Sequence, residues 1–208
     1  MDEITKRNIE AYNTSVDNYF ENTKNLELPA MRIREEFLSL IKTGKRIIDI
    51  GCGPGRDAKI FSDKGFKVTG IDLAEKVLTK AKEVAPKADF KLMDFMHLDF
   101  SDNLFDGIWF NAGLLVIEKK YAPQLLLNIF RILKANGILF VSVKEGKGEG
   151  LAVDKRYNLE KFYAYYSKSE LKETLEKSGF IVLKIDMPNL NSSYHAHKWI
   201  FYLCKKPI

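Results

Sequence analysis

The chain has 208 residues, of which 46% are hydrophobic and 29% are charged, and its formal net charge is +5. This length and composition are typical of one globular domain with its own core. No apolar run reaches the ~18 residues that a membrane-spanning helix needs, and the polar first residues do not resemble a signal peptide. We therefore expect a cytoplasmic protein with no membrane partner. The two cysteines, Cys52 and Cys204, predict neither a disulfide scaffold nor a metal site.

Two helices are predicted before the first strand. Residues 4–20 have a weak apolar pattern that includes Tyr12 and Tyr19. Residues 29–42 have clearer helical spacing, begin at a proline and end before Gly44. We expect residues 1–43 to form a helical cap over one mouth of a sheet. For 29–42 the alternative, a helix packed on a sheet face, stays open.

Residues 45–61 have the pattern of a strand, a tight glycine turn and a helix. The apolar run Ile47–Ile50 contains Asp49 and leads into Gly51, Gly53 and Gly55. Glycine allows a positive φ and a close approach of the backbone to a ligand, and the helix start behind the turn presents free N–H groups. The spacing G-x-G-x-G differs from the G-x-G-x-x-G of dinucleotide sites.

This stretch resembles motif I of the class I S-adenosylmethionine (SAM)-dependent methyltransferases. The resemblance implies that SAM is the cofactor and S-adenosylhomocysteine the product. It also implies that cofactor contacts come from Asp49, Gly51, Cys52, Gly53, Gly55 and Arg56. A βα turn that binds no ligand is the alternative.

The next two strands, residues 66–71 and 89–92, are separated by a predicted helix over 74–85. Asp72 follows the first of them, and the resemblance implies that it binds the ribose hydroxyls, with Leu73 beside it. A helix cap formed by Asp72 and Glu75 is the alternative. After the second strand, the resemblance places Asp94, Phe95 and Met96 at the adenine, whereas a plain surface loop is the alternative.

The fourth strand, 104–110, is followed by a segment that the resemblance places between cofactor and acceptor, with Asn111 and Leu114 as contacts. Val116 stands where many small-molecule members carry a histidine, so we expect no histidine base there. A helix over 121–134, closed by Asn136-Gly137, should lead into a fifth strand over 138–143.

Residues 144–166 interrupt the regular alternation. Their first part contains three glycines, and their second part is rich in tyrosine and phenylalanine. Long irregular connections are usually functional, so we expect a lid that also contacts the acceptor, although part of these aromatic residues could be core. Candidate acceptor contacts are Tyr12, Tyr19, Lys144, Arg156, Tyr157, Tyr165 and His195. His195 and His197 have no evident third metal ligand.

The chain closes with a helix over 168–178, capped by Ser167 and Glu170, which is followed by strands at 180–186 and 198–204. The alternation predicts an α/β fold with a doubly wound, mostly parallel sheet of seven strands in a single domain over 1–208. The resemblance sets the strand order as 3-2-1-4-5-7-6, with the last strand antiparallel.

The expected reaction is methyl transfer from SAM to a nucleophile on a small-molecule acceptor, by a monomer or a homodimer. Two alternatives stay open: an RNA (tRNA) methyltransferase and a non-catalytic SAM-binding domain. The sequence disfavours a nucleic-acid partner, because the lysines are interleaved with acids and form no basic stripe.

Overall fold

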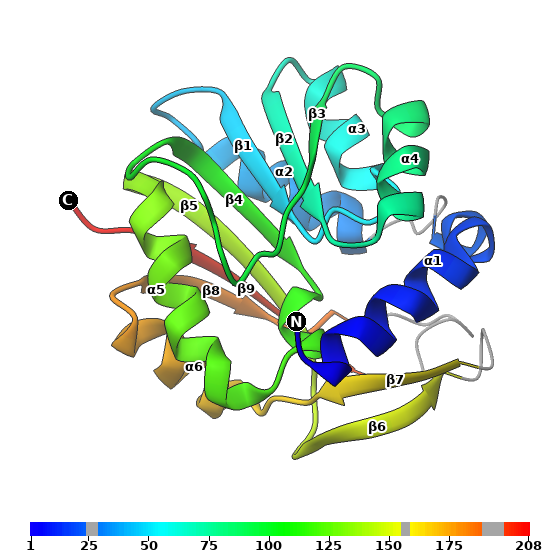
Figure 1. Ribbon diagram of the computed structural model, residues 1–208. Coiled ribbons are helices and arrows are strands. Elements are labelled where there is room, and N and C mark those ends of the chain that lie inside the picture. The colour runs from blue at the N-terminus through cyan, green and yellow to red at the C-terminus, as the bar shows by residue number, and fades with distance from the viewer. Residues whose placement is uncertain (24–28, 155–158, 189–197) are drawn as a thin grey trace.

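One seven-stranded sheet organises the protein (Figure 1). The computed structural model describes residues 1–23, 29–154, 159–188 and 198–208. The strand order is β3-β2-β1-β4-β5-β9-β8, which is the predicted order 3-2-1-4-5-7-6 once a separate hairpin is left out. The first five strands pair in parallel, and β9 is antiparallel to β5 and β8, as expected. The strands of the sheet are β1 (Arg46–Ile50), β2 (Lys67–Asp72), β3 (Asp89–Leu92), β4 (Phe105–Asn111), β5 (Leu133–Lys144), β8 (Ile181–Asp186) and β9 (Trp199–Lys205).

Helices cover both faces of this sheet, and apolar residues alternate between the two faces. In β4, for example, Ile108 and Phe110 join one core cluster and Trp109 joins the other. This follows from the two-residue period of a strand and explains the nearly continuous apolar runs. The helices that follow strands are α3 (Arg56–Asp63), α4 (Glu75–Val84), α5 (Ala122–Ile132) and α6 (Lys168–Lys177), with 3₁₀ turns η1 (Gly113–Val116) and η2 (Lys119–Tyr121). The predicted capping box at Ser167 and Glu170 is present. No described helix is both long enough and apolar enough to cross a membrane.

The two N-terminal helices separate in space. Helix α1 (Glu3–Thr23) runs between α4 and the hairpin, beside the carboxyl edge of the sheet (Figure 1). Helix α2 (Pro29–Leu40) instead packs on a sheet face, where Phe37 contacts Phe61 and Trp109 with ring centroids 5.8 and 5.2 Å apart. The expected shared cap over one mouth is therefore wrong for α2, and the packing alternative is correct.

The junction between α5 and β5 differs from the prediction. The helix ends at Ile132 and the strand begins at Leu133, so Asn136-Gly137 does not close the helix. The register of β4 and β5 shifts just here, and Asn136 has a φ of +61°. The N–H of Asn136 donates to the carbonyl of Lys206, whose N–H donates to the carbonyl of Gly137. Pairing with the end of the chain thus turns the predicted helix stop into an irregularity within a strand.

The segment 144–166 contains regular structure that was not predicted. Strand β5 continues to Lys144, and β6 (Glu149–Asp154) and β7 (Leu159–Ala164) then form an antiparallel hairpin outside the main sheet. The outward side chains of β6, Leu151 and Val153, are about half exposed. Two glycines, Gly146 and Gly148, precede the hairpin and Gly150 lies within β6, so its sequence lacks the continuous apolar run that identifies strands such as β1 and β4.

Candidate functional site

A cavity opens at the carboxyl ends of β1, β2 and β4, and the empty space in and before it, open solvent included, is about 870 Å³. This is the edge of an open α/β sheet where ligands bind. Helix α1 closes one side through Asn8, Tyr12 and Tyr19. Eight of the predicted cofactor contacts line this cavity together: Gly51, Gly53, Asp72, Leu73, Asp94, Phe95, Met96 and Asn111.

A smaller, more polar cavity of about 340 Å³ lies next to the first beneath the glycine turn. The two cavities share Tyr19, Gly51, Gly53 and Asn111 as lining residues. The smaller cavity adds three predicted contacts, Asp49, Cys52 and Arg56, and two residues that were not predicted, Pro54 and Asp57.

The three glycines of the turn all have left-handed backbone conformations. Their φ values are +66° at Gly51, +54° at Gly53 and +82° at Gly55, a region that disfavours residues with a Cβ. A Cβ on Gly53 would lie 3.6 Å from the Tyr19 ring, whereas one on Gly55 would lie 3.0 Å from the backbone of Ala81 in α4. Gly51 and Gly53 therefore keep the cavity wall open, while Gly55 allows close packing of α3 against α4.

Asp72 connects the end of β2 to the glycine turn. One carboxylate oxygen accepts from the N–H of Gly53 at 3.0 Å and the other from the N–H of Ala74 at 2.9 Å. Ala74, not Asp72, is the N-cap of α4, so the helix-cap alternative is wrong. Burial raises the pKa of Asp72, although the backbone N–H groups oppose this shift.

Asp94 orders the loop that follows β3. Its carboxylate accepts from the N–H of Met96 at 2.8 Å, and its carbonyl accepts from the N–H of His97 at 2.9 Å. The segment is therefore a tight turn and not a plain surface loop, and this turn holds Asp94, Phe95 and Met96 against the cavity.

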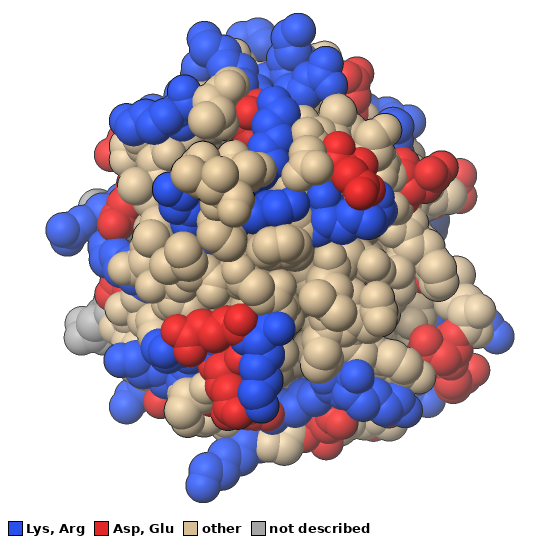
Figure 2. Space-filling model, turned by 90° about the vertical axis from the view of Figure 1, so that its left-hand side faces the viewer, with Lys and Arg blue, Asp and Glu red and all other residues tan. Residues whose placement is uncertain are grey.

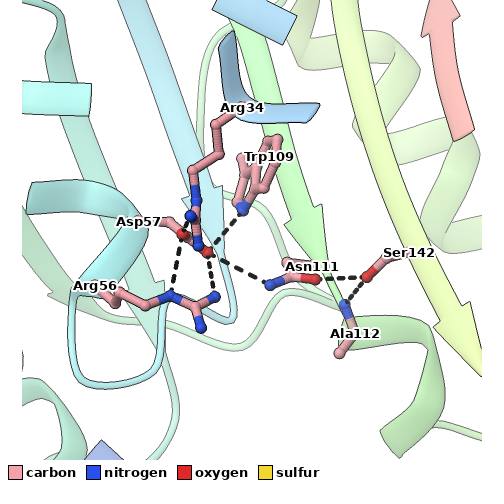
Figure 3. Close-up of polar contacts among 7 residues, drawn as sticks. All are labelled: Arg34, Arg56, Asp57, Trp109, Asn111, Ala112 and Ser142. Atoms are coloured by element: carbon pink, nitrogen blue, oxygen red, sulfur yellow. Dashed lines mark hydrogen bonds and ion pairs between the residues drawn. The ribbon is translucent and has the colours of Figure 1, made fainter. Parts of the chain in front are cut away.

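Asp57, in the first turn of α3, is the centre of a buried polar network (Figure 3). Its carboxylate accepts from Arg34 Nε at 2.6 Å, from Arg56 at 3.2 and 2.9 Å, and from Trp109 Nε1 at 3.0 Å. Burial opposes ionisation of Asp57, but the charges of Arg56 and Arg34 outweigh it and hold its pKa below the usual range. Burial likewise disfavours the charge on Arg56, but Asp57 raises the Arg56 pKa above its usual value.

The same network fixes the side chain of Asn111 at the end of β4 (Figure 3). The Asn111 amide donates to Asp57 at 3.4 Å and accepts from the Ser142 hydroxyl at 2.6 Å. Ser142 in turn accepts from the N–H of Ala112 at 2.9 Å. Because both ends of the Asn111 amide are engaged, its orientation toward the two cavities is set by residues on α3 and β5.

Asp49 is nearly fully buried beside this network. One of its carboxylate oxygens has no hydrogen-bond partner among the described residues, and Asp49 lines the smaller cavity. Burial, followed by the negative charge of Asp57, raises the pKa of Asp49 well above its usual value. The charges of Arg56 and Arg34 oppose this shift, and a further positive charge in the cavity would lower the pKa of Asp49 more.

Three further predicted contacts that the structure describes, Leu114, Lys144 and Tyr165, do not line either cavity. Leu114 is fully buried in the core. Lys144 is 9% exposed and lies over the ring of Tyr163, and Tyr165 stacks on that same ring. Arg156, Tyr157 and His195 lie outside the described residues. Val116, at the position without a histidine, does line the larger cavity, and its carbonyl accepts from Asn8 at 3.2 Å.

Sequence reasoning missed the residues whose side chains form the hydrogen bonds described above, namely Asn8, Arg34, Asp57, Trp109 and Ser142. Asp57 could have been suspected from its place next to Arg56, but an acid in the first turn of a helix is also a common favourable feature. The others gave no signal in the sequence. Within the described ranges, no three His, Cys, Asp or Glu side chains come together in a way that would hold a metal ion.

Comparison with known proteins matches residues 47–137 to a family described as a methyltransferase domain. The chain is 36% identical over 111 residues, half of its length, to a 2-methyl-6-phytyl-1,4-hydroquinone methyltransferase of Synechocystis, of which it covers 34%. It is 27% identical over 174 residues, 78% of its length, to an O-methyltransferase of Pyrenophora dematioidea, of which it covers 64%. The chain thus spans about a third and just under two thirds of these relatives.

Among solved structures, the fold is similar to a 1,6-didemethyltoxoflavin-N1-methyltransferase from Burkholderia thailandensis. The TM-score is 0.77 at 20% identity, and the match covers 98% of this chain and 88% of the other. That structure contains 1,6-didemethyltoxoflavin and S-adenosylhomocysteine. At this level of identity, the likeness bears on the fold.

Proposed function

We propose that the chain transfers a methyl group from SAM to a small-molecule acceptor, because residues 47–137 match a family described as a methyltransferase domain and the sheet has the strand order of the class I, Rossmann-like fold. One observation carries this proposal. The turn with three left-handed glycines, Asp72 and the Asp94 loop come from three successive strands and meet around one cavity.

The residues present fit SAM. The glycine turn gives a wall in which the φ values of Gly51 and Gly53 favour residues without a Cβ. Asp49 presents a buried carboxylate oxygen that lacks a hydrogen-bond partner among the described residues, next to a polar cavity. Such an atom is costly to leave unsatisfied, and the ammonium group of the methionine part of SAM would satisfy it.

Each side chain has a role that its chemistry supports. Asp72 accepts hydrogen bonds from the ribose hydroxyls, and Asp94 with the N–H of Phe95 recognises the adenine edge. Asn111, fixed by Asp57 and Ser142, orients the methionine part together with Arg56. SAM supplies a methyl group on a sulfonium, which is a good leaving group, so the protein mainly needs to align the acceptor and exclude water.

A small-molecule acceptor is supported by the mixture of apolar and polar residues around the larger cavity. On the face that Figure 2 shows, Lys and Arg side chains lie among Asp and Glu around an uncharged middle area. A continuous basic surface, typical of RNA binding, does not extend over that face. Relatives named for hydroquinone and O-methylation support the same acceptor class.

The experiment that tests cofactor binding is calorimetric titration with S-adenosylhomocysteine. We expect Asp72→Ala to weaken binding by about 1.5–3 kcal/mol, the contribution of a hydrogen bond to a charged group. Asp89→Ala is the matched control, because Asp89 is an exposed acid at the start of the neighbouring strand β3. Equal affinity of wild type and a folded Asp72→Ala protein would contradict the ribose role.

Transfer itself is tested by incubating the protein with SAM carrying a radiolabelled methyl group and fractionated pools of metabolites and RNA. We expect label in the metabolite fractions. Label in RNA, with binding that weakens steeply as salt rises, would instead support the RNA methyltransferase alternative.

A further inference from the structure

Ser142 places a hydroxyl in a part of β5 that is otherwise apolar. Residues 138–143 of this strand read Ile-Leu-Phe-Val-Ser-Val, and Ser142 is fully buried. A buried hydroxyl costs free energy unless it is hydrogen-bonded. Ser142 is the register partner of Asn111 at the end of β4, and it forms hydrogen bonds with Asn111 and with the residue after it. The hydroxyl at this position therefore serves the chain that leaves β4.

The hydrogen bonds through Ser142 have fixed directions (Figure 3). The backbone N–H of Ala112 can only donate, and it donates to Ser142 Oγ at 2.9 Å. The Ser142 hydroxyl donates to Asn111 Oδ1 at 2.6 Å, and Asn111 Nδ2 donates to the Asp57 carboxylate at 3.4 Å. A carboxylate only accepts, so turning the Asn111 amide over would place its oxygen against that carboxylate. The amide therefore has one orientation.

The backbone at Ala112 depends on the same hydroxyl. Ala112 has a φ of +64°, a left-handed conformation that residues with a Cβ rarely adopt. Such a conformation persists only where surrounding contacts hold it. Here the N–H of Ala112 donates to Ser142, and the carbonyl of Ala112 accepts from the N–H of Leu115 at 3.2 Å. Ser142 thus holds both the Asn111 amide and the turn from β4 into η1.

The Asn111 amide keeps polar groups for a ligand. Its nitrogen has two N–H donors and its oxygen has two lone pairs, and Asp57 and Ser142 engage one of each. The other N–H and the other lone pair belong to a residue that lines both cavities. A donor next to an acceptor matches an amino-acid end, which carries a carboxylate and an ammonium group.

We propose that Ser142 is a positioning residue for the amino-acid end of the cofactor. Ser142 lines neither cavity, and it acts by holding the Asn111 amide in the orientation that meets this end. The protein thereby distinguishes SAM and S-adenosylhomocysteine from thioether nucleosides without an amino-acid end. This inference rests on the proposed function, because it concerns the cofactor of that reaction.

The test compares the affinities of two ligands by calorimetry. S-adenosylhomocysteine carries the amino-acid end, whereas 5′-methylthioadenosine keeps adenine, ribose and sulfur and lacks that end. We expect wild type to bind S-adenosylhomocysteine at least about tenfold more tightly, as hydrogen bonds to charged groups predict. Ser142→Ala should reduce this preference by at least about threefold by weakening S-adenosylhomocysteine alone. A serine with only a structural role would affect both ligands alike.

Ser178→Ala is the matched control. Ser178 is 4% exposed, and its hydroxyl donates to the carbonyl of Thr174 at 2.8 Å at the end of α6. Its loss should lower stability and leave the preference for S-adenosylhomocysteine unchanged. Ser142→Thr, which retains a hydroxyl, should keep the wild-type preference.

A double variant tests whether Ser142 acts through Asn111. Asn111→Ala should reduce the preference by itself, and adding Ser142→Ala should then reduce it by less than about threefold, since residues that act as one unit are not additive. A larger further reduction would overturn the positioning role. Asn111→Ala also keeps the proposal testable if Ser142→Ala does not fold, because an unchanged preference in Asn111→Ala would contradict it.

Wild-type binding separates this inference from the proposed function. If wild type does not bind S-adenosylhomocysteine, both fall. If it binds S-adenosylhomocysteine but prefers it to 5′-methylthioadenosine by less than about tenfold, only the positioning role falls. The same holds if Ser142→Ala reduces the preference by less than about threefold.

Discussion

Two buried carboxylates, Asp49 and Asp57, lie close together beneath the glycine turn, and their pKa values are shifted in opposite directions. Asp57 accepts hydrogen bonds from two arginines and an indole, and these hold its pKa down. The same arginines also lower the pKa of Asp49, but burial and the charge of Asp57 outweigh them and raise it. Asp72, on the next strand, adds further negative charge. Residue identity alone does not distinguish these acids, because their partners make the difference.

The raised pKa of Asp49 predicts that the Asp49→Asn substitution increases stability in a pH-dependent way. A group whose folded pKa is above its unfolded value stabilises the protein fully below the unfolded pKa, and this contribution is lost as the pH rises through the folded pKa. Asparagine resembles the protonated acid and does not titrate. The free energy of unfolding of Asp49→Asn should therefore rise relative to wild type as the pH increases from about 4.

Urea unfolding between pH 4 and pH 8, without ligand, measures this difference. The groups that face Asp49 are Arg34 from α2, Arg56 and Asp57 from α3, and Asp72 from β2, and all of them are retained in the variant. Asp89→Asn, an exposed acid, serves as the control. Parallel stability curves for wild type and Asp49→Asn would show that the pKa of Asp49 is not raised in the folded protein.

Asp57→Asn should destabilise the protein strongly. Arg34 has a side chain that is only 4% exposed, and loss of the carboxylate leaves its charge buried without this partner. We expect a loss of about 3–5 kcal/mol in the free energy of unfolding, measured by urea titration at pH 7. Asp63→Asn is the control, because Asp63 pairs with Lys59 and Lys87 at the surface and its loss should have little effect. A loss below about 1 kcal/mol would mean that Arg34 finds another partner.

At the scale of elements, loops and strand ends position the site. The glycine turn, the Asp94 loop and the end of β4 each follow a parallel strand, so the sheet brings them to one edge. Helix α3 adds Arg56 and Asp57 from its first turn. Helix α2 reaches the site from the sheet face, since Arg34 extends from it to Asp57.

Gly53→Val tests the glycine turn. Valine is strained at a φ of +54°, and its side chain would point toward the Tyr19 ring in the cavity wall. We expect the affinity for S-adenosylhomocysteine to fall by at least about tenfold, as measured by calorimetry.

Gly65→Val is the matched control for this variant. Gly65 has a φ of +84° and open space around it, and it follows the end of α3 away from the cavity. This substitution should lower stability through the same backbone strain and leave affinity unchanged. If Gly53→Val binds like Gly65→Val, the turn has only a structural role.

At the scale of the whole molecule, α1 connects two distant parts of the chain. Asn8 donates to the carbonyl of Val116 and accepts from the N–H of Phe162, and Arg7 pairs with Glu160 on the hairpin. Farther along the helix, Asn13 accepts from the N–H of Lys76 in α4. The helix therefore covers the cavity only while it remains bound to both β7 and α4.

We propose that α1 and the hairpin act together as a lid. Asn8 and Arg7 join α1 to β7 through polar contacts, and Leu151 and Val153 on the outer strand β6 are about half exposed, so this unit should open at a lower free energy than the sheet. Hydrogen exchange should show α1 and β7 gaining protection together when S-adenosylhomocysteine is added. The buried strand β5 should be protected in both states and serves as the reference. Equal exchange of α1 and β7 with and without ligand would contradict the lid.

The order of elements could be read from the sequence because it depends on local patterns. Apolar β-branched runs, amphipathic runs and their glycine or proline boundaries are set by residues a few positions apart. For the same reason the glycine turn and the acid at the end of β2 could be located in advance. The strand order came from the family resemblance, and the sheet confirms it.

Only the tertiary structure decided the contacts between residues that are far apart in the chain. Asp57 joins partners 23, 52 and 54 positions away, and no local pattern marks such pairs. Three other features also depend on long-range contacts. They are the sheet face on which α2 packs, the hairpin formed in place of an irregular segment, and the early end of α5. In each case, burial or pairing with distant parts of the chain decides the structure. Local sequence thus determined the elements and the turn, whereas long-range packing determined which charges lie beneath that turn and which side chains α1 brings over it.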